Sequence, residues 1–361
     1  MPDLPALTLR DVRVRPVVLT PDQPVETAAG RVAQTCLVLI DLVADEGVTG
    51  RSYLRSYSPL AHKPLATLVG NIASQVLGAA LAPDQLDEQI RRHFALMGTS
   101  GLIGLALAGL DMAAWDALAV AAAVPLARLL GAEPAAVRAY ATLRPMQPAG
   151  RVAAAAEEAA AAGFPAVKVK LGSADLPADL GVLRAVRSAV GDATVIMIDY
   201  NQSLSVDEAI TRIAALEPLG LEWVEEPTRS EDVDGHARIA AAVRTPVQLG
   251  ENWHSTFDVD AAARAGACRL ATFDAARIGG VTGWRRCLPA TAGRPVSSHA
   301  YPEISAHLLA STPVSGWLEY VDHAGPVLAE PVSVRHGFVR VPEQPGSGIG
   351  WDEQAVARAS L

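Results

Sequence analysis

The sequence has little cysteine, and the three cysteines it has are odd in number and far apart. A disulfide framework needs an even number of cysteines, and a zinc knuckle needs ligands only a few residues apart. The pattern therefore excludes both a disulfide-stapled domain and a small zinc domain. The three residues are Cys36, Cys268 and Cys287.

Basic residues are also scarce. There are 30 Lys and Arg against 39 Asp and Glu, which gives a formal net charge of −9. A surface that binds nucleic acid or an anionic membrane needs a basic excess, so we expect neither partner. Charged residues make up only 19% of the chain and apolar residues 50%. This composition excludes a disordered chain and permits a large core.

Long hydrophobic runs are missing as well. The longest stretch without a charge, residues 64–83, contains several polar residues, and the next, residues 94–110, is followed at once by Asp111. Both are typical of helices packed in a protein core rather than of membrane spans. Charged residues between positions 3 and 15 leave no room for the apolar core of a signal peptide. We therefore expect a soluble, cytoplasmic protein.

The chain has 361 residues, enough for two domains or for one barrel with an appendage. Residues 7–18 and 37–42 have strand-like patterns, and residues 64–131 have a helical one, which together predict an α+β module. After residue 137, short apolar runs alternate with helical stretches, a pattern typical of a closed α/β barrel. The eight predicted strands are Val137–Thr142, Ala166–Leu171, Val195–Asp199, Leu221–Glu225, Pro246–Glu251, Arg269–Asp274, Pro295–His299 and Gly316–Glu319.

Seven of these runs end in an ionisable residue, at separations of 20 to 29 residues, about one strand–helix unit each. A single charge of this kind is typical of a chain that leaves a strand for solvent. Seven in succession indicate a site, because the carboxyl ends of barrel strands meet at one mouth. The residues are Lys170, Asp199, Glu225, Glu251, Asp274, His299 and Glu319.

Three of the seven, Asp199, Glu225 and Glu251, are carboxylates on successive strands. Carboxylates brought together without a cation repel one another and raise each other's pKa. Neighbours such as Arg277 and Lys170 would neutralise them only in part. We therefore favour a hard divalent cation with oxygen ligands, such as Mg²⁺.

The remaining residues are suited to acid–base chemistry. Lys168 and Lys170 face the same way on one strand, and two adjacent ammonium groups depress each other's pKa, which favours a base. Asp274 and His299 end adjacent strands, where a carboxylate fixes the tautomer of a histidine and raises its basicity. A neutral Glu319 in a crowded site would donate a hydrogen bond to a developing oxyanion, although a solvated glutamate has the same spacing.

The full set resembles the enolase superfamily, and within it the mandelate racemase subgroup. The similar motifs extend over essentially the whole chain. They are residues 37–42, 109–116, 198–203, 223–227, 250–253, 277–284, 297–299 and 303–309 together with the lysine pair at 168 and 170.

This resemblance implies a (β/α)7β TIM-type barrel over residues 134–320, an N-terminal α+β capping domain over residues 1–133, and a segment 321–361 that packs back on the cap. It implies one Mg²⁺ per subunit, held by Asp199, Glu225 and Glu251, and a homo-oligomer, an octamer or smaller. Lys168 would contact the substrate carboxylate, and Lys170 and His299 would be bases for the two faces of the α-carbon. Asp274 would orient His299, Glu319 would donate to the enolate oxygen, and the substrate pocket would include Asn201, Thr142, Tyr57, Arg55, Arg31 and Val32.

The resemblance implies a small carboxylate substrate and leaves two reactions open. One is racemisation of a 2-hydroxy carboxylate by two opposed bases. The other is dehydration of an acid sugar to a 2-keto-3-deoxy acid, with the same residues. Arg31 and Arg55 favour a substrate more polar than mandelate, whereas the overall resemblance favours racemisation. A barrel kept only for binding is disfavoured because no group of the set is missing.

Overall fold

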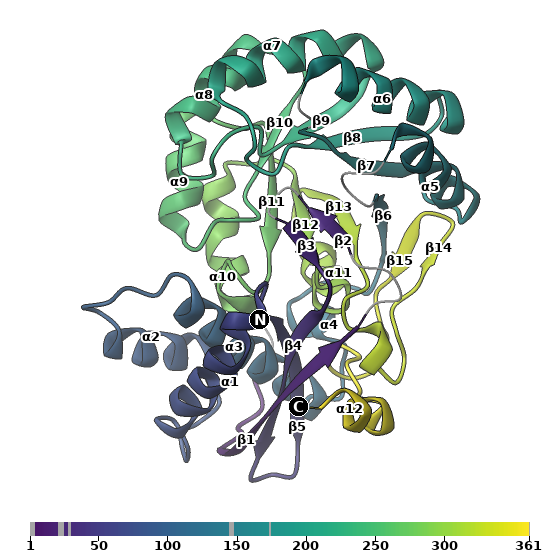
Figure 1. Ribbon diagram of the computed structural model, residues 1–361. Coiled ribbons are helices and arrows are strands. Elements are labelled where there is room, and N and C mark those ends of the chain that lie inside the picture. Colours follow the sequence, from purple (N-terminus) through teal and green to yellow (C-terminus); the bar gives the residue numbers. More distant parts are fainter. Residues whose placement is uncertain (1–3, 21–24, 28–29, 144–147, 173–174, 361) are drawn as a thin grey trace.

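The computed structural model describes residues 4–20, 25–27, 30–143, 148–172 and 175–360, and for 25–27 and 30–32 it describes only the backbone (Figure 1). The N-terminal part is a three-stranded antiparallel sheet with the order β1-β4-β5, covered by helices. A short hairpin, β2–β3, is inserted between its first two strands. The elements are β1 (Leu9–Leu19), β2 (Val25–Thr27), β3 (Gly30–Val32), β4 (Thr35–Ala44), β5 (Thr49–Arg55), α1 (Pro59–Ser74), α2 (Pro83–His93), α3 (Leu102–Ala121) and α4 (Leu126–Leu129).

Helix α3 is apolar on almost every side because it fills the core between the sheet and its neighbours. Gly109 allows this close packing, since a Cβ atom there would lie 2.6 Å from the Ile40 side chain. Among the described residues, α3 is the one helix with the length and hydropathy of a membrane span, and 89% of that stretch is buried inside the protein. It is therefore best explained as a core helix.

The second part is a closed barrel of eight parallel strands with seven intervening helices, so the predicted (β/α)7β architecture is confirmed. Closure comes from β13, which pairs in parallel with β6. The strands are β6 (Ala136–Thr142), β7 (Ala166–Lys170), β8 (Val195–Asp199), β9 (Leu221–Glu225), β10 (Val247–Leu249), β11 (Leu270–Asp274), β12 (Val296–His299) and β13 (Ser315–Tyr320). The helices are α5 (Ala149–Ala161), α6 (Leu176–Val190), α7 (Val206–Leu216), α8 (Val233–Ala242), α9 (Thr256–Ala265), α10 (Gly280–Cys287) and α11 (Pro302–Ala310).

All eight barrel strands lie within two residues of their predicted bounds at each end. Glu251 is the exception among the strand ends, because it follows the last residue of β10 by two positions. The sequence analysis missed β5, whose residues Thr49–Arg55 include a glycine and two arginines and form no apolar run. It is a strand because it pairs along its whole length with the buried strand β4.

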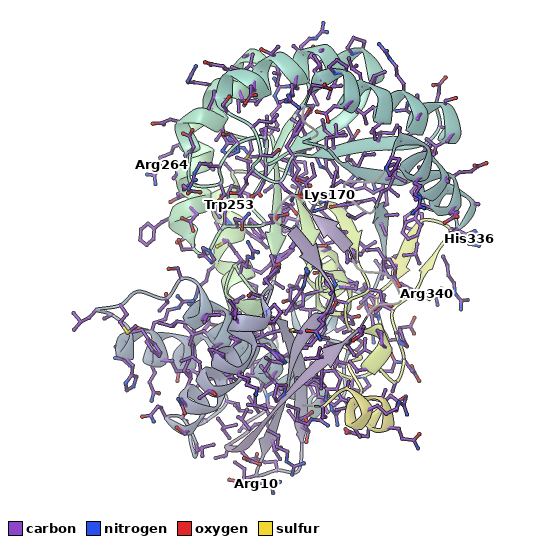
Figure 2. All side chains as sticks on the ribbon, viewed as in Figure 1. Arg10, Lys170, Trp253, Arg264, His336 and Arg340 are labelled. Atoms are coloured by element: carbon purple, nitrogen blue, oxygen red, sulfur yellow. The ribbon has the colours of Figure 1, made fainter. Side chains whose placement is uncertain are left out.

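The C-terminal segment contacts both parts of the molecule. Strand β15 (Phe338–Arg340) pairs antiparallel with β6 and forms a hairpin with β14 (Val334–Arg335). Further along, Trp351 donates a 2.7 Å hydrogen bond to Asp41 of β4, just before helix α12 (Glu353–Ala359). The exact domain boundaries remain a prediction. Figure 2 places Lys170 near the centre of the molecule, between the barrel and the N-terminal domain.

Candidate active site

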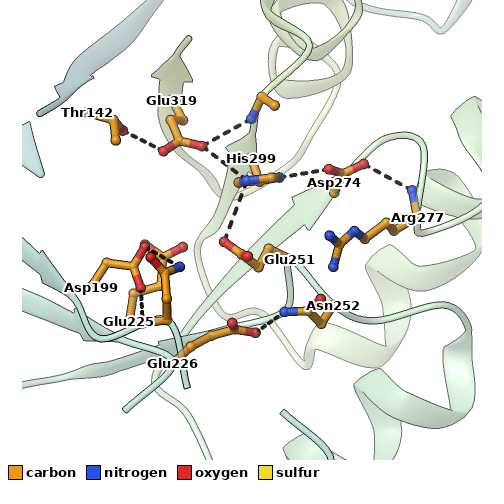
Figure 3. A network of polar contacts seen from close by, with 12 residues as sticks. Thr142, Asp199, Glu225, Glu226, Glu251, Asn252, Asp274, Arg277, His299 and Glu319 are labelled. Carbon is orange, nitrogen blue, oxygen red and sulfur yellow. Dashed lines mark hydrogen bonds and ion pairs between the residues drawn. The ribbon is translucent and has the colours of Figure 1, made fainter. Parts of the chain in front are cut away.

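The centre of the site is a group of three buried carboxylates, Asp199, Glu225 and Glu251 (Figure 3). They come from the ends of β8 and β9 and from the turn after β10, which are neighbours in the barrel. One oxygen atom from each lies within 4.8 Å of the others. The structure therefore brings together the three residues that the sequence predicts as metal ligands.

The charges of this group are not balanced by the described side chains. Burial raises the pKa of Glu225 to about 8, against the pull of the Lys168 ammonium, and the other carboxylates add to the rise. Glu225 Oε1 is buried and has no hydrogen-bond partner among the described residues. Three clustered oxygen donors with one orphaned atom fit a hard divalent cation such as Mg²⁺.

Lys168 lies beneath this group and is almost fully buried. Its Nζ atom is 2.9 Å from Glu225 Oε2 and 2.9 Å from Glu319 Oε1. Burial alone would lower its pKa, but these carboxylates raise the pKa well above its ordinary value. Lys168 is therefore a fixed positive charge that bridges two glutamates, a contact that the sequence analysis did not predict.

Lys170 is more accessible and contacts the edge of the group formed by β8. Its Nζ donates a 2.8 Å hydrogen bond to Asn201 Oδ1 and lies 3.3 Å from Asp199 Oδ2. The prediction that Lys168 depresses the pKa of Lys170 is wrong for this arrangement. Burial and Lys168 lower this pKa, but the Asp199 carboxylate outweighs them and the pKa is raised.

His299 contacts the opposite edge of the group. Its Nδ1 atom is 2.7 Å from Asp274 Oδ2, and its Nε2 atom is 3.6 Å from Glu251 Oε2. Asp274 also accepts hydrogen bonds from the backbone N–H groups of Ala276 and Arg277, which hold it as an ionised acceptor. Burial alone would lower the pKa of His299, but the nearby glutamates raise it to about 9.

Tyr57 reaches this dyad from the N-terminal domain. Its hydroxyl donates a 2.8 Å hydrogen bond to Asp274 Oδ2, and its backbone φ is 56°, in the left-handed region. A bulky residue with positive φ is strained, and such strain is common at functional sites. The sequence analysis predicted Tyr57 in the substrate pocket, whereas the structure places its hydroxyl on the carboxylate that orients His299.

Glu319 differs from its prediction in charge. Its carboxylate accepts hydrogen bonds from Thr142 Oγ1 at 2.5 Å and from the backbone N–H of Ala300 at 3.2 Å. Burial alone would raise its pKa, but Lys168 and His299 bring the pKa well below its usual range. Glu319 is therefore ionised here rather than neutral. The predicted donor role requires an anion such as a substrate carboxylate to arrive beside it and raise that pKa. Thr142, predicted as a substrate contact, serves this glutamate.

The predicted pocket residues of the N-terminal domain are only partly described. Arg55 ends β5, and its guanidinium carbon lies 4.9 Å from the centre of the Tyr57 ring. Arg31 and Val32 belong to β3, and their side chains lie outside the described residues.

The sequence analysis missed two residues at this site. His323 assigned no role there, yet its Nε2 atom is 3.2 Å from Arg55 Nη1. Glu226 is buried next to a carboxylate ligand and accepts hydrogen bonds from Asn252 at 2.6 Å and Gln202 at 3.1 Å. The signal was available for both, because each follows closely after the end of a barrel strand.

Comparison with known proteins agrees with this geometry. Residues 9–131 match the profile of the mandelate racemase/muconate lactonizing enzyme N-terminal domain, and residues 151–355 match the enolase C-terminal domain-like profile. The chain is 31% identical to a 3,6-anhydro-alpha-L-galactonate cycloisomerase of Streptomyces coelicolor, over 94% of this chain and 96% of that one. It is 29% identical to an L-talarate/galactarate dehydratase of Salmonella typhimurium, over 93% of this chain and 86% of that one.

A solved structure is also similar over almost the full length. An enolase from Bradyrhizobium, complexed with magnesium and mandelic acid, has a TM-score of 0.94 and 38% identity, with 99% of each chain covered. The resemblance seen in the sequence is thereby confirmed at the level of the family. The chain belongs to the mandelate racemase/muconate lactonizing enzyme family of the enolase superfamily.

Proposed function

We propose that this protein removes the α-proton of a 2-hydroxy carboxylate in a Mg²⁺-dependent reaction, and that the net reaction is racemisation. The observation that carries this proposal is the placement of two bases at opposite edges of the carboxylate group. Lys170 lies 3.3 Å from Asp199, and His299 lies 3.6 Å from Glu251. A carbon atom held over the group has one base on each face.

Asp199, Glu225 and Glu251 are the residues that would hold the cation. When bound, Mg²⁺ supplies positive charge that holds the substrate carboxylate and lowers the pKa values of the two bases. Lys168 adds a fixed positive charge beneath the same position. Together these charges offset the second negative charge that develops on the carboxylate as the α-proton leaves.

Each base has a partner that sets its position. Asn201 accepts a hydrogen bond from Lys170 and is itself held by Asp199 through its backbone N–H at 2.7 Å. Asp274 receives the Nδ1 proton of His299, which leaves Nε2 free to take or return the proton of the substrate. Two positioned bases with one proton each are what inversion at carbon requires.

Dehydration of an acid sugar is the second candidate. The 29% identical talarate/galactarate dehydratase and the guanidinium of Arg55 near the site favour it. In that reaction one base removes the α-proton, and His299 then protonates a departing β-hydroxyl. The mandelic acid complex of the 38% identical enolase favours racemisation instead.

One experiment separates these reactions. The Mg²⁺-loaded protein is incubated in deuterated buffer with single enantiomers of 2-hydroxy acids and with aldonic and aldaric acids. Polarimetry reports racemisation, a semicarbazide assay reports 2-keto products, and proton NMR reports loss of the α-proton. Keto products without racemisation would establish dehydration, and no α-proton exchange with any acid would refute both reactions.

A further inference from the structure

Arg55 carries a charge that no described carboxylate balances. Its backbone N–H donates to the Tyr301 hydroxyl at 3.0 Å, which ties the end of β5 to the barrel. Its guanidinium makes one hydrogen bond among the described residues, to His323 Nε2 at 3.2 Å, and no ion pair with them. Arginine has five N–H donors, so most of its capacity is unused.

The partner of Arg55 is neutral. A guanidinium can only donate, so His323 Nε2 must accept and carry no proton. Burial lowers the pKa of His323 to about 3, and the charge of Arg55 adds to the effect. A neutral imidazole orients the guanidinium but does not compensate its charge. A partly buried charge of this kind is costly unless an anion meets it.

This charge lies close to the reacting groups. The Arg55 guanidinium is 4.9 Å from the centre of the Tyr57 ring, and the hydroxyl of that ring binds Asp274. Arg277 lies 4.5 Å from the centre of the same ring. Arg55 is therefore one aromatic ring away from the Asp274–His299 dyad, on the side of the N-terminal domain.

We infer that Arg55, oriented by His323, binds a second carboxylate at the far end of the substrate. The substrate class is then a hydroxy dicarboxylate, with one carboxylate at the metal group and the other at Arg55. A carboxylate fits better than a neutral hydroxyl chain, because the planar guanidinium forms paired charge-assisted hydrogen bonds with it. This inference rests on the proposed function, in which the first carboxylate lies over Asp199, Glu225 and Glu251.

The competing explanation is structural. Arg55 would then serve only to pack on Tyr57 and to hold His323, and its charge would face water. The two explanations differ in substrate preference, since a structural arginine affects all substrates alike.

The test uses matched pairs of acid sugars that differ only at the terminal carbon, a carboxylate in the aldarate and a CH₂OH group in the aldonate. Rates of α-proton exchange in deuterated buffer with Mg²⁺ give kcat/KM for each member of a pair. The proteins are the wild type, Arg55→Gln, Arg55→Lys and a control, Arg13→Gln. Arg13 is an exposed arginine of β1 in the same domain. Circular dichroism confirms that each variant is folded.

We expect the wild type and Arg13→Gln to prefer the aldarate, and Arg55→Gln to reduce that preference about tenfold or more, which is about 1.4 kcal/mol. Arg55→Lys should retain part of it. Equal loss for both members of a pair, or no aldarate preference in the wild type, overturns the inference while the proposed function stands.

Calorimetry keeps the two proposals distinct. If no acid exchanges its α-proton, the proposed function fails, and binding of each pair to the Mg²⁺-loaded protein tests the subsite by itself. Tighter binding of the aldarate that Arg55→Gln removes supports the subsite. Equal binding of aldarate and aldonate overturns it.

Discussion

Tyr57 of the N-terminal domain and His299 of the barrel contact the same oxygen atom. Asp274 Oδ2 accepts the Tyr57 hydroxyl at 2.8 Å and lies 2.7 Å from His299 Nδ1. The two residues are far apart in the sequence and lie in different parts of the fold. The position and basicity of His299 therefore depend on how the N-terminal domain lies on the barrel.

This contact predicts the effect of Tyr57→Phe. The hydroxyl helps to keep the pKa of Asp274 low. Its removal makes the carboxylate more available to His299 and should raise the pKa of His299. In the direction for which His299 is the base, we expect kcat near neutral pH to fall about tenfold, as for loss of a hydrogen bond to a charged group.

The measurement is the pH profile of kcat with each enantiomer. Tyr320→Phe is the matched control, because the Tyr320 hydroxyl donates to the Val332 carbonyl and does not reach the dyad. An unchanged profile in Tyr57→Phe would show that Tyr57 does not influence His299.

The carboxylate group predicts the behaviour of Glu225→Gln. The amide keeps the size of the side chain but removes one of three negative charges, so we expect Mg²⁺ affinity to fall at least about tenfold and activity to fall with it. Without Mg²⁺ the melting temperature should not decrease, because a buried charge with a raised pKa is lost. Isothermal titration calorimetry and thermal denaturation measure the two effects.

Glu222→Gln is the control for this substitution. Glu222 is an exposed residue of the same strand, β9, and its loss should leave Mg²⁺ affinity unchanged. Full metal-dependent activity in Glu225→Gln would remove Glu225 from the set of ligands.

The two-base arrangement predicts complementary defects. His299→Asn should abolish racemisation in both directions but leave α-proton exchange for the enantiomer on which Lys170 acts. Lys170→Met should leave exchange only for the other enantiomer. Proton NMR in deuterated buffer distinguishes the two. If a folded His299→Asn variant exchanges neither enantiomer, the scheme with two independent bases is incorrect.

A pH effect on stability is expected at His307. Its Nδ1 atom accepts the Ala127 backbone N–H at 3.1 Å, so Nε2 holds the proton and donates to the Ser347 carbonyl at 3.2 Å. Burial lowers its pKa from 6.5 to about 4. Between these values the unfolded chain binds more protons than the folded one. Stability should therefore be fully present above pH 6.5 and fall as the pH falls toward 4, by up to about 3 kcal/mol.

Urea unfolding at several pH values measures this effect. His307→Gln can accept and donate in the same way without titrating, so its stability should depend less on pH in this window. His93→Gln, at an exposed position, is the control and should follow the wild type. Equal pH dependence in wild type and His307→Gln would contradict the assignment.

The sequence alone determined the barrel and the membership of its site. Strand patterns recur at intervals of one strand–helix unit, and a barrel brings the carboxyl ends of its strands to one rim. Knowing the end of each strand was therefore enough to predict that Asp199, Glu225 and Glu251 meet, and that Asp274 and His299 are neighbours. No knowledge of side-chain packing was needed.

Charge states and contacts between distant segments were decided only by the tertiary structure. Lys170 has a raised pKa and Glu319 a lowered one, opposite to the sequence-based predictions, because through-space charges outweigh burial. Arg55 and His323 are 268 positions apart and meet only because β5 lies against the mouth of the barrel. Sequence spacing describes order along the chain, whereas pKa values and ion pairing depend on distance and burial, which exist only once the chain has folded.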